Sequence, residues 1–139
     1  LFLIGSSARV PIAAQNFQLV GHVGGTVQTG VVSGNFAYIS EGAFLTVLDL
    51  STSPPTARGR IGLPDYPEHM VARGSDIYIA CGYLGGLRVV RCANPDQPFV
   101  AFQTDTIGSG SGVATATGRS YIADGFYGLL IISMTEALL

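Results

Sequence analysis

The stretch Ile77-Tyr78-Ile79-Ala80-Cys81-Gly82, followed after a short loop by Leu87-Arg88-Val89-Val90-Arg91-Cys92, decides the fold. Both runs are rich in β-branched and aromatic residues, which favour strands. The connecting residues Tyr83-Leu84-Gly85-Gly86 have the glycine content of a hairpin loop. Because both runs are almost continuously apolar, we expect both faces of the resulting sheet to be covered.

The same pattern occurs three times along the chain of 139 residues. Repeats of forty-odd residues are typical of β-propeller blades, in which each repeat is one small antiparallel sheet. The recurring positions are Leu45, Leu87 and Leu129, spaced by 42 residues, and Tyr38, Tyr78 and Tyr121, spaced by 40 and 43.

Each repeat divides into strands that we label A to D. In the second repeat we expect strand A at 70–73, B at 77–81, C at 87–92 and D at 99–103. Asn94-Pro95-Asp96-Gln97-Pro98 ends strand C, because proline cannot donate a hydrogen bond within a central ladder.

The two ends of the chain carry incomplete repeats. Residues 18–23 are expected to form an isolated strand D, and the third repeat has strands A, B and C alone. Ser133-Met134-Thr135-Glu136 has the spacing of a capping box and predicts a final helical turn.

The Tyr-Ile-Ala-Cys-Gly run at 78–82, the glycine loop, Leu87-Arg88-Val89-Val90 and the Asn-Pro turn at 94–95 resemble the LVIVD repeat of bacterial and archaeal surface β-propellers. The resemblance covers roughly residues 17–133. It implies an all-β propeller of about three four-stranded blades over residues 15–139, on a secreted or cell-surface protein. The aspartate that ends strand C in this family is matched by Asp49 but replaced by Arg91 and Ser133.

A propeller ring has about four to eight blades, so three blades do not close one. We expect either an incomplete ring or a part of a larger propeller, completed by further blades of a parent chain or by a second copy. In a pair of copies, residues 18–23 of one copy would complete the third blade of the other.

Residues 1–14 form an apolar start with small residues at Ala13 and Ala14, before Gln15. This pattern is typical of the end of a secretory signal peptide, and the alternative is an ordinary first strand. Cys81 and Cys92 are expected to be free thiols, because they lie near opposite ends of the 77–92 hairpin, beyond disulfide reach.

Composition excludes several functions. Charged residues make up 12% of the chain and the net charge is −2, so no basic stripe is available for nucleic acid. No run of about 20 apolar residues predicts a membrane span. His22 and His69 stand apart from other ligand types, so we expect neither a metal nor a cofactor.

The run Gly108-Ser109-Gly110-Ser111-Gly112 has the letters of a nucleophile elbow. It lies between two strands with no helix after it, so a flexible connection is the better interpretation. A phosphate cradle is disfavoured for the same reason.

In a propeller the B-to-C and D-to-A loops share one edge, which we call the top rim. Binding residues often lie on such loops, which a rigid frame holds together. The carboxylates of this rim also suit turn structure, and its aromatic residues also suit packing between blades. The candidate binding residues are Glu41, Asp65, Tyr66, Glu68, His69, Tyr83, Asp124 and Tyr127, with Phe44 and Phe126 beside them.

These observations favour a non-enzymatic binding or adhesion scaffold that recognises a protein or a glycan. The first alternative is a hydrolase or lyase that uses Asp65, Glu68 and His69 on the top rim. The second is a structural array that joins copies into an assembly. Fold alone does not separate them, because propellers host many activities.

Overall fold

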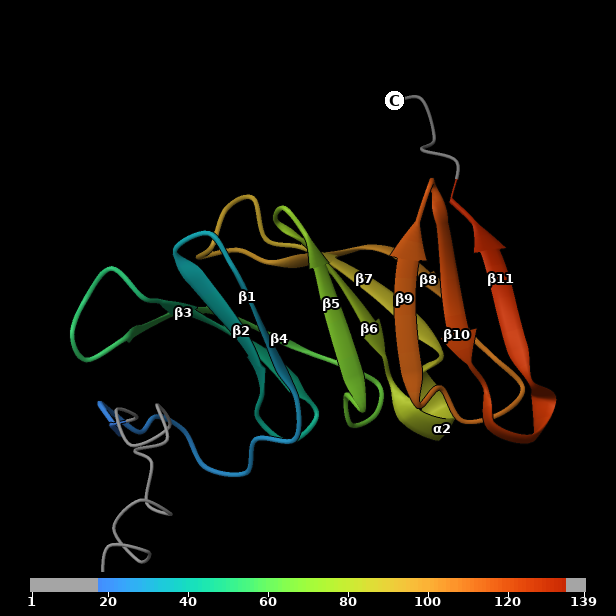
Figure 1. Ribbon diagram of the computed structural model, residues 1–139, viewed down its shortest axis with the longest axis horizontal. Helices are drawn as coiled ribbons and strands as arrows, with labels where there is room; N and C mark the ends of the chain where they lie inside the picture. The colour runs from blue at the N-terminus through green and yellow to red at the C-terminus, as the bar shows by residue number, and fades with distance from the viewer. Residues whose placement is uncertain (1–17, 135–139) are drawn as a thin grey trace, which may run out of the picture.

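A computed structural model describes residues 18–134, which form three antiparallel sheets lying side by side (Figure 1). The all-β propeller-blade fold expected from the repeats is therefore confirmed. The first blade contains β1 (Gly30–Ser33), β2 (Phe36–Ser40), β3 (Phe44–Asp49) and β4 (Thr56–Gly62). The second contains β5 (His69–Arg73), β6 (Asp76–Ala80), β7 (Leu87–Arg91) and β8 (Phe99–Thr104), and the third contains β9 (Gly112–Ala116), β10 (Arg119–Ala123) and β11 (Leu129–Ser133).

Each sheet is a meander in which sequential strands pair as antiparallel neighbours, so the strands correspond to A, B, C and D in order. The third blade has strands A, B and C within the described residues, as expected. The B-to-C loops contain two short helical turns, α2 (Gly82–Gly85) in the second blade and the 3-10 turn η2 (Gly125–Tyr127) in the third.

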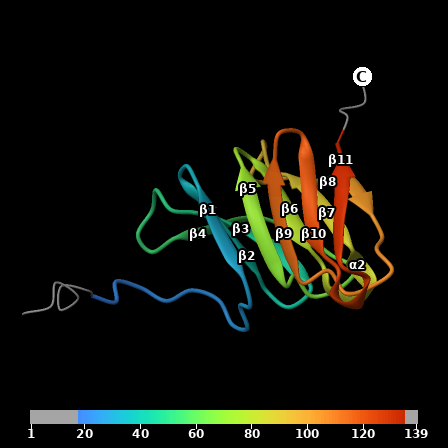
Figure 2. The ribbon, with the colours of Figure 1, turned by 45° about the vertical axis from the view of Figure 1, so that its right-hand side comes forward.

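The expected isolated strand D at 18–23 is wrong. Residues 18–29 run up to β1 without forming a strand, and no blade edge pairs with residues 18–23. The unpaired edge that such a strand would complete, β11, belongs to the last blade, at the opposite end of the row of sheets (Figures 1 and 2). The signal-like segment 1–14 lies outside the described residues, as do residues 135–136 of the helical turn expected at 133–136, whose first residue Ser133 ends β11.

Alternation along the strands gives each blade two different faces. The pairings Tyr38↔Val47, Tyr78↔Val89 and Tyr121↔Ile131 place the repeated tyrosine on what we call the tyrosine face. Ile39, Ile79 and Ile122, one residue later, point to the opposite side, which we call the isoleucine face.

The blades stack tyrosine face to isoleucine face. One buried cluster joins Tyr38, Leu45 and Val47 of the first blade to Ile77, Ile79 and Val90 of the second. A second buried cluster repeats this arrangement between the second blade and the third, with members Tyr78, Ala80, Leu87, Val89, Val113 and Ile122. Burying each leucine or isoleucine side chain contributes about 1.5–3 kcal/mol, so these two interfaces hold the row of sheets together.

The edge opposite the top rim carries a second link between the first two blades. Arg58 of β4 forms ion pairs with Asp49 of its own blade, at 3.1 Å, and with Asp96 in the C-to-D turn of the second blade, at 2.7 Å. Gly59 donates its backbone N–H to the Pro95 carbonyl at 2.7 Å, and a Cβ at Gly59 would overlap that carbonyl. A glycine is therefore required where β4 contacts the C-to-D turn of the second blade.

Cys81 and Cys92 are both free and buried, which confirms the expectation for this pair. The pairings Ala80↔Leu87 and Asp76↔Arg91 show why. Cys81 follows β6 at one end of the hairpin and Cys92 follows β7 at the other.

None of the described helices is long and apolar enough to cross a membrane.

Candidate functional site

The top rim, at the lower edge of Figure 1, is built from loops of successive blades that bond to each other. Gly82, in the B-to-C loop of the second blade, donates its N–H to the Gly110 carbonyl at 3.1 Å. Gly110, in the following D-to-A loop, donates back to the Gly82 carbonyl at 3.0 Å. This pair of bonds forms an isolated antiparallel bridge that fixes one loop against the next.

Asp65 fastens a second pair of rim loops. Its carboxylate accepts hydrogen bonds from the backbone N–H of Tyr66 at 2.8 Å and of Leu84, in α2, at 3.1 Å. Hydrogen bonds from the N–H groups of Leu84, Tyr66 and Tyr83 lower the pKa of Asp65, because they favour its charged form. Asp65 is thus a carboxylate that holds two aromatic-bearing loops in place.

Asp124 joins two rim loops of the third blade in the same way. It is fully buried, and its Oδ2 accepts a hydrogen bond from the Gly108 N–H at 3.0 Å. Its backbone carbonyl accepts from Tyr127 at 3.2 Å, which closes the η2 turn. The other carboxylate oxygen, Oδ1, is buried without a hydrogen-bond partner. Asp124 therefore supports the rim from below and does not face solvent.

Glu41 and Glu68 are the remaining carboxylates of the candidate set, and each has a hydrogen-bond partner. The Glu41 carboxylate accepts a bond from the Thr46 hydroxyl at 2.6 Å within the first blade. Glu68, which is exposed, accepts one from the Gln28 side-chain amide at 2.6 Å. Glu68 thereby fixes the segment before β1 against the second blade.

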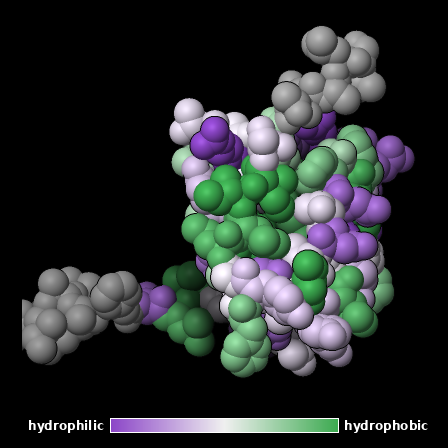
Figure 3. Space-filling model, turned by 90° about the vertical axis from the view of Figure 1, so that its right-hand side faces the viewer, coloured by the Kyte–Doolittle hydropathy of each residue, from purple (hydrophilic) through white to green (hydrophobic). Residues whose placement is uncertain are grey.

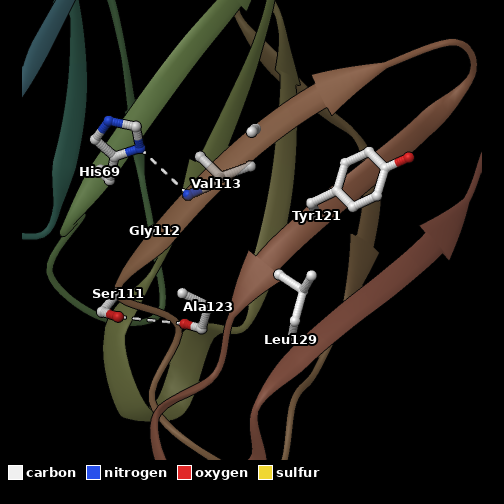
Figure 4. Close-up of a pocket in the computed structure, with 8 residues that line it drawn as sticks. His69, Ser111, Gly112, Val113, Tyr121, Ala123 and Leu129 are labelled. Atoms are coloured by element: carbon white, nitrogen blue, oxygen red, sulfur yellow. Dashed lines mark hydrogen bonds between the residues drawn. The ribbon is translucent and has the colours of Figure 1, made fainter.

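His69 is the first residue of β5. The sequence analysis had instead placed it in the D-to-A loop before that strand. Its Nδ1 accepts a hydrogen bond from the Val113 N–H at 3.2 Å, so its neutral ring carries the proton on Nε2. Figure 4 shows the imidazole directed at β9, beside an open hollow of about 290 Å³. The hollow is lined by His69, Ser111, Gly112, Val113, Ala114, Tyr121, Ala123 and Leu129.

Aromatic residues form the outermost layer of the top rim. Tyr83 is 69% exposed in α2, and Phe126 is completely exposed in η2. Both side chains extend from short loops whose backbones are tied down by Asp65 and Asp124. The other exposed aromatic residues of the rim are Phe44, Tyr66 and Tyr127.

Two buried side chains below the rim, Cys81 and Arg88, are not positioned for catalysis. Burial raises the pKa of the Cys81 thiol to about 12, so it is protonated at neutral pH and a poor nucleophile. Arg88 is buried and reaches Asp105 with an ion pair of 2.8 Å.

The three residues of the enzyme alternative share no hydrogen bond that the structure records among the described residues. Asp65, Glu68 and His69 bond to three different partners, namely backbone N–H groups, Gln28 and Val113. Within residues 18–134, no group of three or more His, Cys, Asp or Glu side chains is placed to hold a metal ion.

Sequence reasoning did not identify the Gly82–Gly110 bridge or the hollow beside His69. Both depend on contacts between residues of different blades. The spacing of the repeats does not show which residues of neighbouring blades meet. The glycines at 108–112 carried a partial signal, since a Cβ at Gly108 would overlap the Asp124 carbonyl.

Comparison with protein families matches the LVIVD repeat to residues 24–60, which include the whole first blade up to the middle of β4. This match confirms the resemblance seen in the sequence. Neither the comparison with curated proteins nor that with solved structures found a match.

Proposed function

We propose that this chain, a row of propeller blades carrying the LVIVD repeat, is a non-enzymatic binding scaffold of a secreted or cell-surface protein. In this proposal the top rim contacts a protein or glycan ligand. The observation that carries it is the set of exposed aromatic side chains on rim loops that are fixed to neighbouring loops by hydrogen bonds.

Rigid loops matter because binding costs conformational freedom. A loop that is already ordered loses less entropy when a ligand arrives, so its contacts contribute more to affinity. Tyrosine adds large contact area with only two rotatable side-chain bonds, which explains its frequency in binding loops. Tyr83 and Phe126 combine both properties, because each is exposed on a backbone pinned by a carboxylate.

The carboxylates support this proposal over the hydrolase or lyase alternative. A general acid or base needs a side chain within hydrogen-bond reach of the substrate. Asp65 directs its oxygens at the backbone N–H groups of Tyr66 and Leu84, and those bonds would have to break before it could act on a substrate. Asp124 is fully buried, out of reach of a substrate at the rim surface.

The test is a binding screen of the folded chain against an array of extracellular glycans and a panel of extracellular protein domains. For a ligand that binds, Tyr83→Ala and Phe126→Ala should each weaken binding about tenfold or more, as truncation of an aromatic anchor does. Phe99→Ala is the matched control, because Phe99 is an exposed aromatic residue of β8, outside the rim loops.

Two results would contradict the proposal. One is binding that Tyr83→Ala and Phe126→Ala leave unchanged. The other is turnover of a glycoside or ester substrate that is lost in Glu68→Gln, which would favour the enzyme alternative.

A further inference from the structure

Within residues 18–134 no further blade covers the tyrosine face of the third blade, although its residues match those that are buried in the other blades. Leu129 is 62% exposed, whereas the equivalent Leu45 and Leu87 are 0% exposed. Ile131 is 59% exposed, whereas the equivalent Val47 and Val89 are buried. Figure 3 shows hydrophobic residues gathered on this side of the molecule.

On the first blade, the opposite face, the isoleucine face, is the one left exposed. Ile39 is partly exposed on its isoleucine face, whereas the equivalent Ile79 and Ile122 are 0% exposed. Val32, which lies on the same face in β1, is 62% exposed. In the described part of the chain, no blade packs on either of these end faces, and the two faces are therefore the two halves of one type of interface.

The molecule shows twice how such halves fit. The tyrosine face of the first blade packs on the isoleucine face of the second, and the second packs on the third in the same way. We propose that the third blade packs its tyrosine face on the isoleucine face of the first blade of a second copy of this chain.

Three features favour a second copy as the occupant. The chain itself supplies both complementary surfaces, so no unknown partner is needed. The contact joins different surfaces, so it repeats head to tail and closes when the rotation allows. Two copies of the three described blades give six, a number within the usual size of a propeller ring.

The hollow beside His69 lies on the same uncovered face, since Tyr121, Ala123 and Leu129 line it (Figure 4). Exposed apolar side chains that lie together on one face mark interaction surfaces. The hollow is thus part of the interface proposed here and is separate from the exposed aromatic residues of the top rim.

The test is sedimentation equilibrium of the full chain at high micromolar concentration. The unsubstituted chain should sediment at twice the monomer mass. Ile131→Asp on the tyrosine face and Val32→Asp on the isoleucine face should each sediment at the monomer mass. Circular dichroism of both variants should match the parent, because both positions are exposed within one chain.

Mixing the two variants makes the test specific for head-to-tail packing. Each variant keeps one intact face, so an equimolar mixture should regain a one-to-one dimer through one interface. Phe99→Asp, an exposed position in β8 of the second blade, is the control and should dimerise like the parent.

The proposal is overturned if the unsubstituted chain stays monomeric at every concentration. It is also overturned if Val32→Asp still dimerises while Ile131→Asp does not, because that result means two tyrosine faces pack on each other. A mixture that stays monomeric excludes the head-to-tail arrangement.

Discussion

The Asp65 carboxylate accepts a hydrogen bond of 3.1 Å from the backbone N–H of Leu84, nineteen residues later in the chain. Asp65 lies in the loop that enters the second blade, and Leu84 lies in the loop between its two central strands. One charged side chain thereby fixes the two loops that carry Tyr66 and Tyr83.

Replacing Asp65 by asparagine should lower the free energy of unfolding at pH 7 by about 1 kcal/mol, because a charged acceptor of backbone N–H groups becomes a neutral one. The pKa of Asp65 is lower in the folded state than its usual value of about 3.9. The stabilisation by its charge is therefore present above that pH and is lost as the pH falls through the folded-state pKa.

Thermal unfolding of the parent and of Asp65→Asn as a function of pH checks this expectation. The difference in melting temperature should be largest near neutral pH and should shrink in acid. A difference that stays constant from pH 7 to pH 2 would show that the charge of Asp65 has no part in holding the loops.

The two cysteines should be unreactive in the folded protein and reactive after unfolding. Burial raises the pKa of both thiols to about 12, and neither is exposed to reagent. Titration with a thiol reagent should detect no fast-reacting group in the native chain and two groups in denaturant without reductant. Fewer than two groups in a denatured, monomeric chain would mean that the hairpin pairing is wrong.

Gly108→Ala should disrupt the support below the top rim. A Cβ at Gly108 would overlap the Asp124 carbonyl, so the loop must move and the bond from the Gly108 N–H to Asp124 weakens. We expect a loss of about 1–3 kcal/mol, typical of an overpacked site. Gly21→Ala is the matched control, because nothing lies within 4 Å of its Cβ position, and it should leave urea unfolding unchanged.

Much of the fold could be predicted because the same pattern of strands and loops occurs in three repeats. Leu87, Tyr78 and Ile79 have counterparts in the other repeats at spacings of forty-odd residues, and strand alternation then assigns each to one face of a blade. Residues 18–23 were misassigned because an apolar stretch resembles a strand even where it pairs with no sheet edge, and the edge it was expected to complete, β11, lies at the other end of the row.

The sequence allowed us to predict which residues belong to the candidate site. It did not allow us to predict what each side chain does there. The sequence placed the carboxylates and aromatic residues on one rim, but it did not show which oxygens would point at backbone N–H groups. For Asp124 that depends on a partner in another loop, Gly108, whose approach is set by the packing of the blades.

Tyr78→Ala should lower the free energy of unfolding by about 2–4 kcal/mol, because Tyr78 is a member of the buried cluster between the second and third blades. Glu68→Ala should change it by less than about 0.5 kcal/mol, since its bond to Gln28 is exposed. Urea unfolding of the two variants measures both values. Equal losses would contradict the assigned burial.

The stacking of tyrosine face on isoleucine face is the central claim, and Leu87 and Leu129 test it most directly. They hold the same position in successive blades, but Leu87 is buried at an interface and Leu129 faces outward. Urea unfolding of Leu87→Ala and Leu129→Ala should be measured at a concentration low enough to keep the chain monomeric. Leu87→Ala should cost about 2–5 kcal/mol and Leu129→Ala less than about 1 kcal/mol. Similar losses at the two positions would contradict the stacking of the blades described here.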